Sequence, residues 1–335
     1  MSSSLPAVPV LDEELATRIA DRLGMIEDRL RSSVETSDDM TRWTARHLMD
    51  AGGKRVRPML VLLAAALGDI DEDSVLDAAV LVELTHLASL YHDDVMDSAP
   101  TRRGTDSAHA LWGNNVAILT GDFLFARASA LSARIGPSAV TLHSETFERL
   151  CLGQLHETVG PAPQDDPFDH YISVLSDKTA SLLALAGELG AILAGAPAGT
   201  GDVMRRYGEK VGVAFQLADD VLDLGSDAAT SGKTPGIDLR EGVPTMPTLL
   251  VRRRASQEGD ARSRQIVERL DGDLSSDESL AELVSLLQDD PALGATRELA
   301  QRTADESVAI LEELPAGVVR DALIEFTRTL VERRR

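Results

Sequence analysis

Apolar residues recur at helical spacing along almost the whole chain, and the apolar–polar alternation typical of half-buried strands is missing. Three stretches are long and apolar enough to form buried core helices, at residues 75–96, 178–193 and 204–224. Clusters of glycine and proline lie between these stretches, where turns are expected. The pattern therefore predicts an all-α fold.

No change in composition divides the chain cleanly, so we expect one all-α domain over residues 1–335, with a motif-bearing core at about 45–250. Residues 255–295 are acidic and polar, which predicts surface helices and loops. A chain of this length can bury roughly three quarters of its unfolded surface, so a large apolar core is possible.

Composition narrows the functional classes. The formal net charge is −22, which argues against a nucleic-acid partner because such binding needs clustered cations. Cys151 is the single cysteine, so no internal disulfide can form and a reducing, cytoplasmic location is expected. The N-terminus lacks a signal-peptide pattern, and we expect no membrane span because every long apolar stretch is interrupted.

Two DDxxD motifs end apolar helices, at residues 93–97 and 219–223, and they lie 126 positions apart (219 − 93). Residues i and i+4 share a helix face, so Asp93 and Asp97 can aim at one point, as can Asp219 and Asp223. Two similar acidic helix ends could face each other across one cavity. Carboxylate-only clusters suit Mg²⁺, which also accepts phosphate oxygens. The alternative is a pair of solvated acidic helix ends.

Two other readings of nearby residues are weaker. Glu83 and His86 have the ExxH spacing of di-iron bundles, but those sites need a second ExxH and none exists here. Gly232-Lys233-Thr234 looks like the end of a phosphate loop, but the position that must be glycine is Asp227. We therefore reject both a di-iron site and an NTPase.

Cationic clusters accompany the acidic motifs. GGKRVRP at 52–58 places three cations in a glycine-led turn, and Arg102-Arg103 follows the first motif closely. Lys178-Thr179 opens an apolar helix, and Lys233 follows the second motif. A lone basic cluster is usually a solvated face. Beside two DDxxD motifs, these clusters are better explained as an anion site, because arginine and lysine both bind phosphate.

At this point the chain resembles the trans-prenyl diphosphate synthases of the polyprenyl synthetase family. The resemblance covers residues 52–247. Its motifs are GGKRVRP at 52–58, the block at 86–97, RRG at 102–104, GNNVAILTGD at 113–122, KTA at 178–180 and FQLADDVLD at 215–223. The resemblance implies a helical bundle around a deep central apolar cavity, usually a homodimer, that elongates an allylic diphosphate with isopentenyl diphosphate.

The resemblance also implies roles for single residues. The expected Mg²⁺ ligands, for roughly three ions when substrate is bound, are Asp93, Asp97, Asp219 and Asp223, with Asp94 and Asp220 in support. The residues expected to bind isopentenyl diphosphate are Lys54, Arg57, His86 and Arg103. Those expected to contact the allylic diphosphate are Arg102, Lys178, Thr179 and Gln216, with Lys233 as a further candidate. The acidic residues and Lys178 form the expected catalytic set.

The sequence departs from the family pattern after the second motif. Family members often carry lysine at the positions of Ile237 and Val243. One cation is therefore missing near the second motif, and Lys233 and Arg240 are candidate replacements.

Residues before the first motif predict the product length. Bulky side chains one turn before Asp93 would close the cavity, but Ala88 and Ser89 are small and Thr85, a turn deeper, is modest. Because one helical turn rises about 5.4 Å, we expect a medium or long product of about thirty to fifty carbons. A twenty-carbon or shorter product, made by a geranylgeranyl or farnesyl diphosphate synthase, is the main alternative. Leu81, Leu84, Phe123 or Phe125 would then form the floor.

Two other functions compete. A class I terpene cyclase normally replaces the second DDxxD and needs no isopentenyl diphosphate site, so the cations at 52–58 and 102–103 count against it. A non-catalytic partner subunit would lose acidic motifs, whereas this chain keeps both. Whether the purified chain turns over alone would test the partner-subunit hypothesis.

Overall fold

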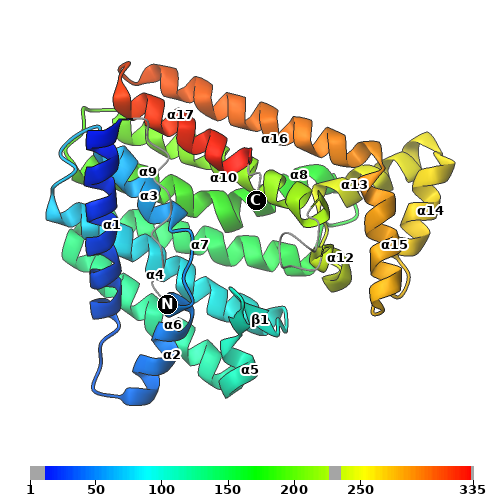
Figure 1. Ribbon diagram of the computed structural model, residues 1–335, viewed down its shortest axis with the longest axis horizontal. Helices are drawn as coiled ribbons and strands as arrows, with labels where there is room; N and C mark the ends of the chain where they lie inside the picture. The colour runs from blue at the N-terminus through cyan, green and yellow to red at the C-terminus, as the bar shows by residue number, and fades with distance from the viewer. Residues whose placement is uncertain (1–11, 226–234, 333–335) are drawn as a thin grey trace. The chain divides into compact units, whose positions relative to one another are not determined.

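The computed structural model describes residues 12–225 and 235–332, and nearly all of its regular structure is helical, which confirms the all-α prediction (Figure 1). The elements are α1 (Glu13–Ser33), α2 (Asp39–Asp50), α3 (Val56–Ala65), α4 (Asp73–Met96), β1 (Thr101–Arg102), β2 (Thr105–Asp106), α5 (Ala108–Trp112), α6 (Asn114–Ile135), α7 (Pro137–Val159), α8 (Pro167–Leu175), η1 (Ser176–Ala180), α9 (Ser181–Leu193), α10 (Thr200–Gly225), α12 (Ile237–Glu241), α13 (Met246–Arg253), η2 (Arg254–Glu258), α14 (Ala261–Leu270), α15 (Asp277–Gln288), α16 (Pro291–Ile310), η3 (Leu311–Glu313) and α17 (Val318–Val331).

Aspartate begins several of these helices. The carboxylates of Asp12, Asp38, Asp166 and Asp260 each accept a hydrogen bond from a backbone N–H in the first turn of α1, α2, α8 and α14. Such caps satisfy orphan donors and place negative charge at the positive end of the helix dipole. Part of the acidic composition therefore stabilises helix starts.

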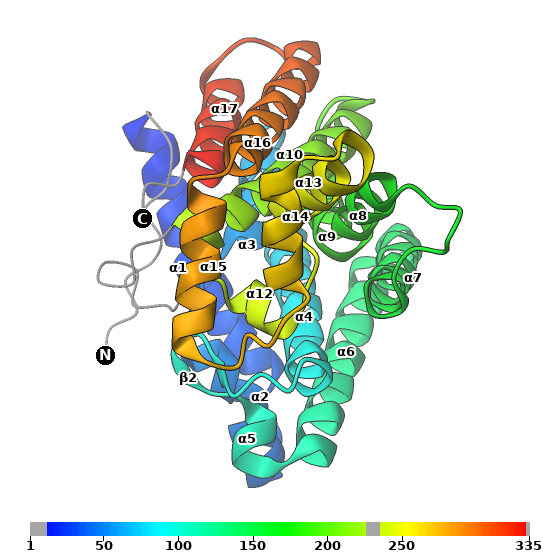
Figure 2. The same ribbon diagram turned by 90° about the vertical axis from the view of Figure 1, so that its right-hand side faces the viewer.

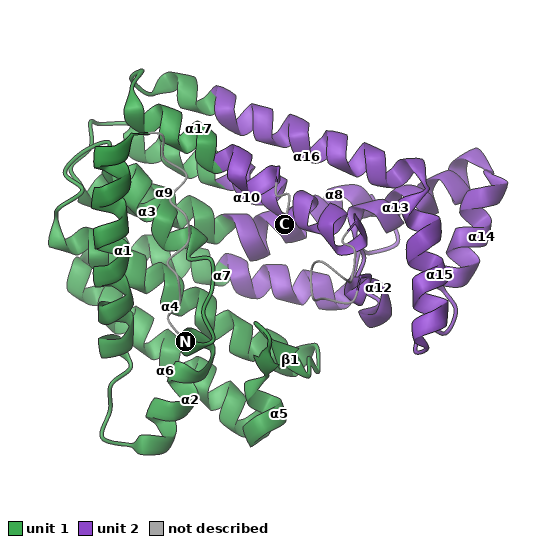
Figure 3. Cartoon of the chain, in the orientation of Figure 1, with its two compact units in different colours: residues 1–148, 181–208, 310–326 green, residues 149–180, 209–309, 327–335 purple. Residues whose placement is uncertain are grey.

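The chain forms two compact units (Figure 3). Unit 1 comprises residues 1–148, 181–208 and 310–326, and unit 2 comprises residues 149–180, 209–309 and 327–335. The first DDxxD motif belongs to unit 1 and the second to unit 2. The single domain expected over residues 1–335 stays a prediction.

Helix α4 forms the core of unit 1. It packs against α1, α3, α6 and α9, and it is buried along most of its length. Glycines allow the closest approaches in this unit: a Cβ on Gly121 would lie 2.4 Å from the His92 ring, and one on Gly190 would lie 2.4 Å from the Val61 carbonyl oxygen. The backbones of α6 and α9 can thus come close to α4 and α3.

Unit 2 is held by two apolar clusters. One joins Val221 and Leu224 of α10 to α13, α14, α15 and the start of α16, and the other joins Leu217 to Tyr171 and Met246. Figure 2 shows α14 and α15 side by side, and they contact each other. The acidic segment at 255–295 is therefore helical, with leucines on its inner faces.

Three local features were not predicted. Residues 101–106 form a short antiparallel hairpin, whose turn places Arg103 at φ 53° and Gly104 at φ 76°, as in a type I′ turn. The stretch predicted as one helix over 178–193 begins with the π-helical turn η1 before α9 starts. A second π-helical turn, η2, follows α13.

By length and composition alone, α4 and α6 are apolar enough to cross a membrane. Within the chain, 78% of the apolar window of α4 is buried but only 39% of that of α6. Burial explains α4 as a core helix, whereas α6 keeps an apolar face uncovered by the described residues of its own chain. The absence of a membrane span stays a prediction.

Candidate active site

The first acidic motif divides into two kinds of carboxylate. Asp94 is fully buried, and its Oδ1 accepts a hydrogen bond of 2.6 Å from Nε of Arg102. Its Oδ2 has no hydrogen-bond partner among the described residues. Burial raises the pKa of Asp94, and the positive charge of Arg102 opposes that rise. Asp93 is half-buried and Asp97 is exposed, so these two, one turn apart, remain accessible to a ligand.

The glycine-led turn before α3 separates its cations. Gly52 and Gly53 have φ of 95° and 150°, and Arg55 itself is left-handed at φ 45°. This geometry turns Arg55 inward, where it is buried, while Lys54 stays exposed. Arg55 is therefore part of the protein interior, whereas Lys54 is exposed and Arg57 is half-buried, and their ligand roles stay predictions.

Arg103 lies on this turn. Its Nη1 donates to the Leu48 carbonyl at 2.9 Å and also to the Gly52 carbonyl. A Cβ on Gly53 would lie 3.0 Å from the Arg103 guanidinium, so a side chain there would press on the guanidinium and would also be strained at φ 150°. The hairpin tip and the glycine turn, 51 residues apart, are thus locked together.

Burial changes the ionisation of two further candidates. It lowers the pKa of Arg57 to about 10, with Glu83 opposing the effect and Arg103 adding to it. Burial also lowers the pKa of His86 well below its ordinary value, and nearby arginines lower it further. His86 is therefore a neutral imidazole at neutral pH and does not add another positive charge.

The second acidic motif shows the same division. Asp220 is buried, and its Oδ2 accepts hydrogen bonds from the Tyr171 hydroxyl at 2.7 Å and the Met246 backbone N–H at 3.0 Å. Burial raises the pKa of Asp220 to about 7, although these two bonds lower it. Asp219 and Asp223 are half-buried. In each motif, the middle aspartate anchors the helix end and the outer pair stays accessible.

The π-helical turn η1 carries Lys178 and Thr179. Lys178 forms an ion pair with Glu157, and the Thr179 hydroxyl donates to Oε1 of Gln216 at 3.3 Å. A Cβ on Gly153 of α7 would lie 2.9 Å from the Lys178 backbone nitrogen, so α7 packs tightly against this turn. Lysine, threonine and glutamine are therefore brought together within unit 2.

The cations proposed to replace the missing lysines are only partly described. Lys233 lies outside the described residues. Arg240 forms an ion pair of 2.6 Å with Asp277, and Ile237 is 39% exposed. Arg240 is therefore already neutralised by a partner within unit 2.

Comparisons with known proteins agree with this geometry. The model of the family described as polyprenyl synthetase matches residues 39–287. Nonaprenyl diphosphate synthase of Mycobacterium tuberculosis is 39% identical over 320 residues, which is 94% of each chain. The chain belongs to the polyprenyl synthetase family. It is a prenyltransferase, and its fold is the all-α isoprenoid synthase fold.

Solved structures of this family place divalent metal on the same fold. Polyprenyl synthase from Caulobacter crescentus CB15, complexed with calcium and isoprenyl diphosphate, is similar with a TM-score of 0.86 and 33% identity, covering 96% of this chain and 97% of that one. Geranylgeranyl pyrophosphate synthase from Corynebacterium glutamicum, complexed with calcium and isoprenyl diphosphate, has a TM-score of 0.84 and 41% identity, covering 96% and 98%.

The acidic residues fit a hard divalent cation. The outer aspartates of each motif offer only oxygen donors, in i, i+4 pairs that reach solvent. Across residues 12–225 and 235–332, no three His, Cys, Asp or Glu side chains gather as a closed metal site. The exposed or half-buried carboxylate pairs themselves fit a hard divalent cation, which is bound by carboxylate oxygens and completes its shell with water and phosphate oxygens.

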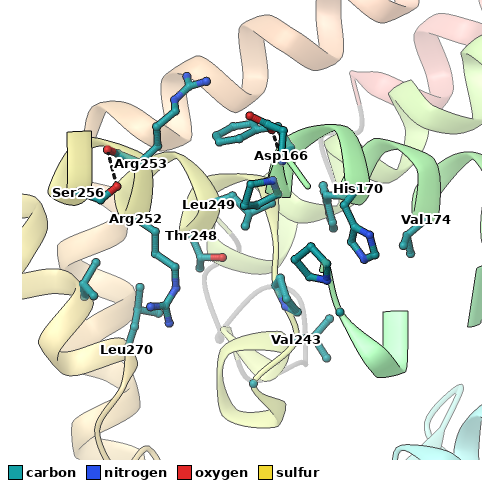
Figure 4. Close-up of a pocket in the computed structure, with 18 of the residues that line it drawn as sticks. Asp166, His170, Val174, Val243, Thr248, Leu249, Arg252, Arg253, Ser256 and Leu270 are labelled. Atoms are coloured by element: carbon teal, nitrogen blue, oxygen red, sulfur yellow. Dashed lines mark hydrogen bonds between the residues drawn. The ribbon is translucent and has the colours of Figure 1, made fainter. Parts of the chain in front are cut away.

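A pocket of about 720 Å³ lies within unit 2, between α8, the loop at 242–244, α13 and α14 (Figure 4). Its walls are largely apolar. They include Val243, which stands at one of the two positions where family members often carry lysine. Tyr171, which donates to Asp220, also lines it, as does Glu157, the partner of Lys178. The pocket therefore borders the residues that support the second motif.

Three residues next to the site were missed by sequence reasoning. Glu83 contacts the arginines of unit 1, Glu157 pairs with Lys178, and Tyr171 holds Asp220. Of these three, only Glu83 is noticeable in the sequence, because it is an acidic residue inside an apolar helix, one turn before His86. From the sequence alone, Glu83 is weighed only as half of a di-iron motif. The other two depend on contacts over long sequence separations.

Proposed function

We propose that this prenyltransferase condenses isopentenyl diphosphate head-to-tail with an allylic diphosphate, in the presence of Mg²⁺, to form a medium- or long-chain trans-polyprenyl diphosphate. The observation that carries the proposal is the pairing, in unit 1, of an accessible Asp93/Asp97 pair with a cluster of cations at 54–57 and 102–103. An enzyme that only ionises one diphosphate would not need the second anion site.

In this proposal, cationic residues bind the two diphosphates and acidic residues bind the metal. Lys54, Arg57 and Arg103, with neutral His86, bind the isopentenyl diphosphate, while Arg102, Lys178, Thr179 and Gln216 contact the allylic diphosphate. The guanidinium group of arginine can donate two parallel hydrogen bonds to one phosphate group. Asp93, Asp97, Asp219 and Asp223 hold the metal, which neutralises charge on the departing diphosphate.

The reaction needs no side-chain nucleophile. The allylic C–O bond breaks, the isopentenyl double bond attacks the resulting carbocation, and a proton leaves to restore a double bond. In this proposal, the released diphosphate takes that proton. The chain's contribution is to orient the two diphosphates and to stabilise the developing negative charge.

Helix α4 supports a product longer than twenty carbons. His86, Ser89, Leu90 and Asp93 form its accessible stripe, which Asp97 continues at the C-cap, with no bulky aromatic residue one turn before Asp93. Ala88 is fully buried beside this stripe, so Ser89 is the better position for controlling length.

Two turns before the motif, the stripe gives way to a buried polar pair. Thr85 donates to the Leu81 carbonyl at 2.8 Å and lies 3.0 Å from Nε2 of His143.

A twenty-carbon product is the second candidate. It is favoured by the 41% identity to the Corynebacterium glutamicum geranylgeranyl pyrophosphate synthase. The Thr85–His143 pair would then close the path, because both side chains are buried and hydrogen-bonded to each other.

We also propose a cytoplasmic homodimer. Helix α6 presents Leu119, Phe123, Ala126 and Ala130 along one face, of which Leu119 is 65% exposed. A second copy would cover this apolar stripe. Leu119→Glu should convert a dimer to a monomer in light scattering, whereas Val318→Glu, at another exposed apolar position, should not. A wild-type monomer would contradict the proposal.

The decisive test is turnover. The purified chain is incubated with Mg²⁺, isopentenyl diphosphate and dimethylallyl, geranyl, farnesyl or geranylgeranyl diphosphate, and product masses are measured. We expect Mg²⁺-dependent products of about thirty to fifty carbons. Products that end at twenty carbons would select the second candidate. No elongation with any primer would overturn the proposal.

A further inference from the structure

Glu83 is a buried acid among the cations of unit 1. Its side chain is 2% exposed and belongs to α4, one turn before His86. Buried carboxylates are rare unless they are paired, because removing a charge from water is costly. Its partners therefore show what the residue does.

A single oxygen of Glu83 faces two arginines. Oε1 accepts a hydrogen bond of 2.9 Å from Nη1 of Arg55, and it lies 4.0 Å from Nη2 of Arg103. The negative charge of Glu83 also acts on Arg57, because it opposes the fall that burial causes in the pKa of Arg57. Glu83 is thus the common counter-charge of three arginines that come from the glycine turn and the hairpin tip.

Among the described residues, Arg55 pairs with a second acid, whereas Arg103 has only Glu83. Glu27 of α1 forms an ion pair with Arg55, so Arg55 stays partly neutralised without Glu83. Within residues 12–225 and 235–332, Glu83 is the only acid within 4.0 Å of the Arg103 guanidinium. The hydrogen bonds of Arg103 within these residues go to the carbonyl oxygens of Leu48 and Gly52.

We propose that Glu83 is a positioning residue of the isopentenyl diphosphate site, which holds Arg103 over the glycine turn and keeps mutually repelling arginines in place before substrate arrives. The proposal rests on the proposed function, because it assigns Arg103 and Arg57 to that substrate. Glu83 itself is not placed against substrate, because its side chain is only 2% exposed.

The proposal predicts a selective defect. Without the charge of Glu83, Arg103 loses its anionic anchor while Arg55 and Arg57 still repel it, so the guanidinium moves from the turn. Affinity for isopentenyl diphosphate should fall. The KM for the allylic primer and the kcat at saturation of both substrates should change little.

The test is steady-state elongation by Glu83→Gln at fixed saturating Mg²⁺, with each substrate varied in turn. We expect the KM for isopentenyl diphosphate to rise roughly ten-fold or more, because opposite charges about 4 Å apart interact strongly at a partly buried site. The primer KM and kcat should stay within about two-fold of wild type. Equilibrium binding of isopentenyl diphosphate, measured by calorimetry without primer, should weaken by the same factor as the KM rises.

Two matched variants separate positioning from general damage. Glu27→Gln removes the other acid of Arg55 without touching Arg103, so it should leave the KM for isopentenyl diphosphate unchanged. Asp77→Asn removes another acid of α4, which pairs with Arg29 and Arg134, and it controls for loss of stability. Equal KM increases in Glu83→Gln and Glu27→Gln would overturn the proposal.

A conservative variant covers the case in which Glu83→Gln does not fold. Glu83→Asp keeps the negative charge, but its side chain is one methylene shorter and the carboxylate lies farther from the arginines. We therefore expect a smaller rise in the KM for isopentenyl diphosphate than in Glu83→Gln. An unchanged KM for isopentenyl diphosphate in the folded Glu83 variants would also overturn the proposal. If wild-type protein fails to elongate any primer, the proposed function fails instead, and the calorimetric binding of isopentenyl diphosphate still tests Glu83 separately.

Discussion

Gly121 makes the packing of α6 on α4 sensitive to a single methyl group. In Gly121→Ala, the new Cβ would lie 2.4 Å from Cδ2 and Nε2 of His92 and 3.2 Å from the Ala88 carbonyl oxygen. The His92 ring cannot turn away without cost. Its Nε2 is 3.1 Å from the Ile118 carbonyl and 3.3 Å from Asp122, and it packs on Phe125. Either the ring leaves these partners or the helices separate.

The size of the effect follows from two opposing terms. Overpacking a close contact costs about 1–3 kcal/mol, whereas replacing glycine by alanine inside a helix gains about 1 kcal/mol. Because His92 is held on three sides, we expect the upper part of that range and a net loss of about 1–2 kcal/mol. Gly24 supplies the matched control, since it lies inside α1 with nothing within 4 Å of its Cβ position. Gly24→Ala should stabilise by about 0.5–1 kcal/mol.

The assay is urea unfolding of wild type, Gly121→Ala, Gly24→Ala, His92→Ala and the double variant Gly121→Ala/His92→Ala, monitored by circular dichroism. The clash with the ring disappears in the His92→Ala background. There, Gly121→Ala should be neutral or stabilising. The reasoning is refuted if Gly121→Ala stabilises wild type as much as Gly24→Ala does, or if its cost is unchanged in the His92→Ala background.

Three further predictions concern function and pH. Ser89→Phe should shorten the product by one or more isoprene units, as measured by mass spectrometry. An unchanged product distribution would show that Ser89 does not determine the length. Ala88 is more buried, so Ala88→Phe should also shorten the product but with a loss of stability. Burial lowers the pKa of His143, so the unfolded state binds more protons as pH falls below about 6.5; stability should therefore fall with pH by at most about 1.4 kcal/mol per pH unit from this group. His143→Gln should flatten that slope in urea unfolding from pH 7.5 to 5.5, and an unaltered slope would contradict the assignment. Asp97→Asn should raise the Mg²⁺ concentration needed for half-maximal activity by roughly ten-fold or more, while Asp94→Asn should mainly lower the unfolding midpoint.

The helical period alone predicts that Asp93 and Asp97, four residues apart, share a face. In the structure Asp93 lies in the last turn of α4 and Asp97 caps its C-terminus, while their roles as metal ligands stay a prediction. Composition and period also predict the all-α fold. The middle aspartates are different. Their burial depends on Arg102 and Tyr171, and a local pattern says nothing about partners 49 residues away, as for Tyr171 and Asp220.

Backbone details were also beyond local patterns. Arg103 is left-handed, an uncommon conformation for a residue with a Cβ, and its side chain donates to the carbonyl oxygens of Leu48 in α2 and Gly52 in the glycine turn. Lysine and threonine at 178–179 were read as ordinary helix, although Gly153 of α7 packs against them where the helix widens. Sequence reasoning identifies which residues carry charge. Contacts between residues far apart in the sequence decide which of those charged side chains are buried and support the fold.

The π-helical turn η1 has a genetic consequence. A π-turn carries one residue more than the α-helix around it, and each residue advances a helix by about 100°. Deleting one residue within Ser176–Ala180 would let α8 and α9 join as one regular helix, at the cost of turning α8 by that angle. Deletion of Ser176, for example, would keep Lys178 and Thr179 but redirect them. In this segment, changes of chain length by a single codon should therefore affect activity more than most substitutions.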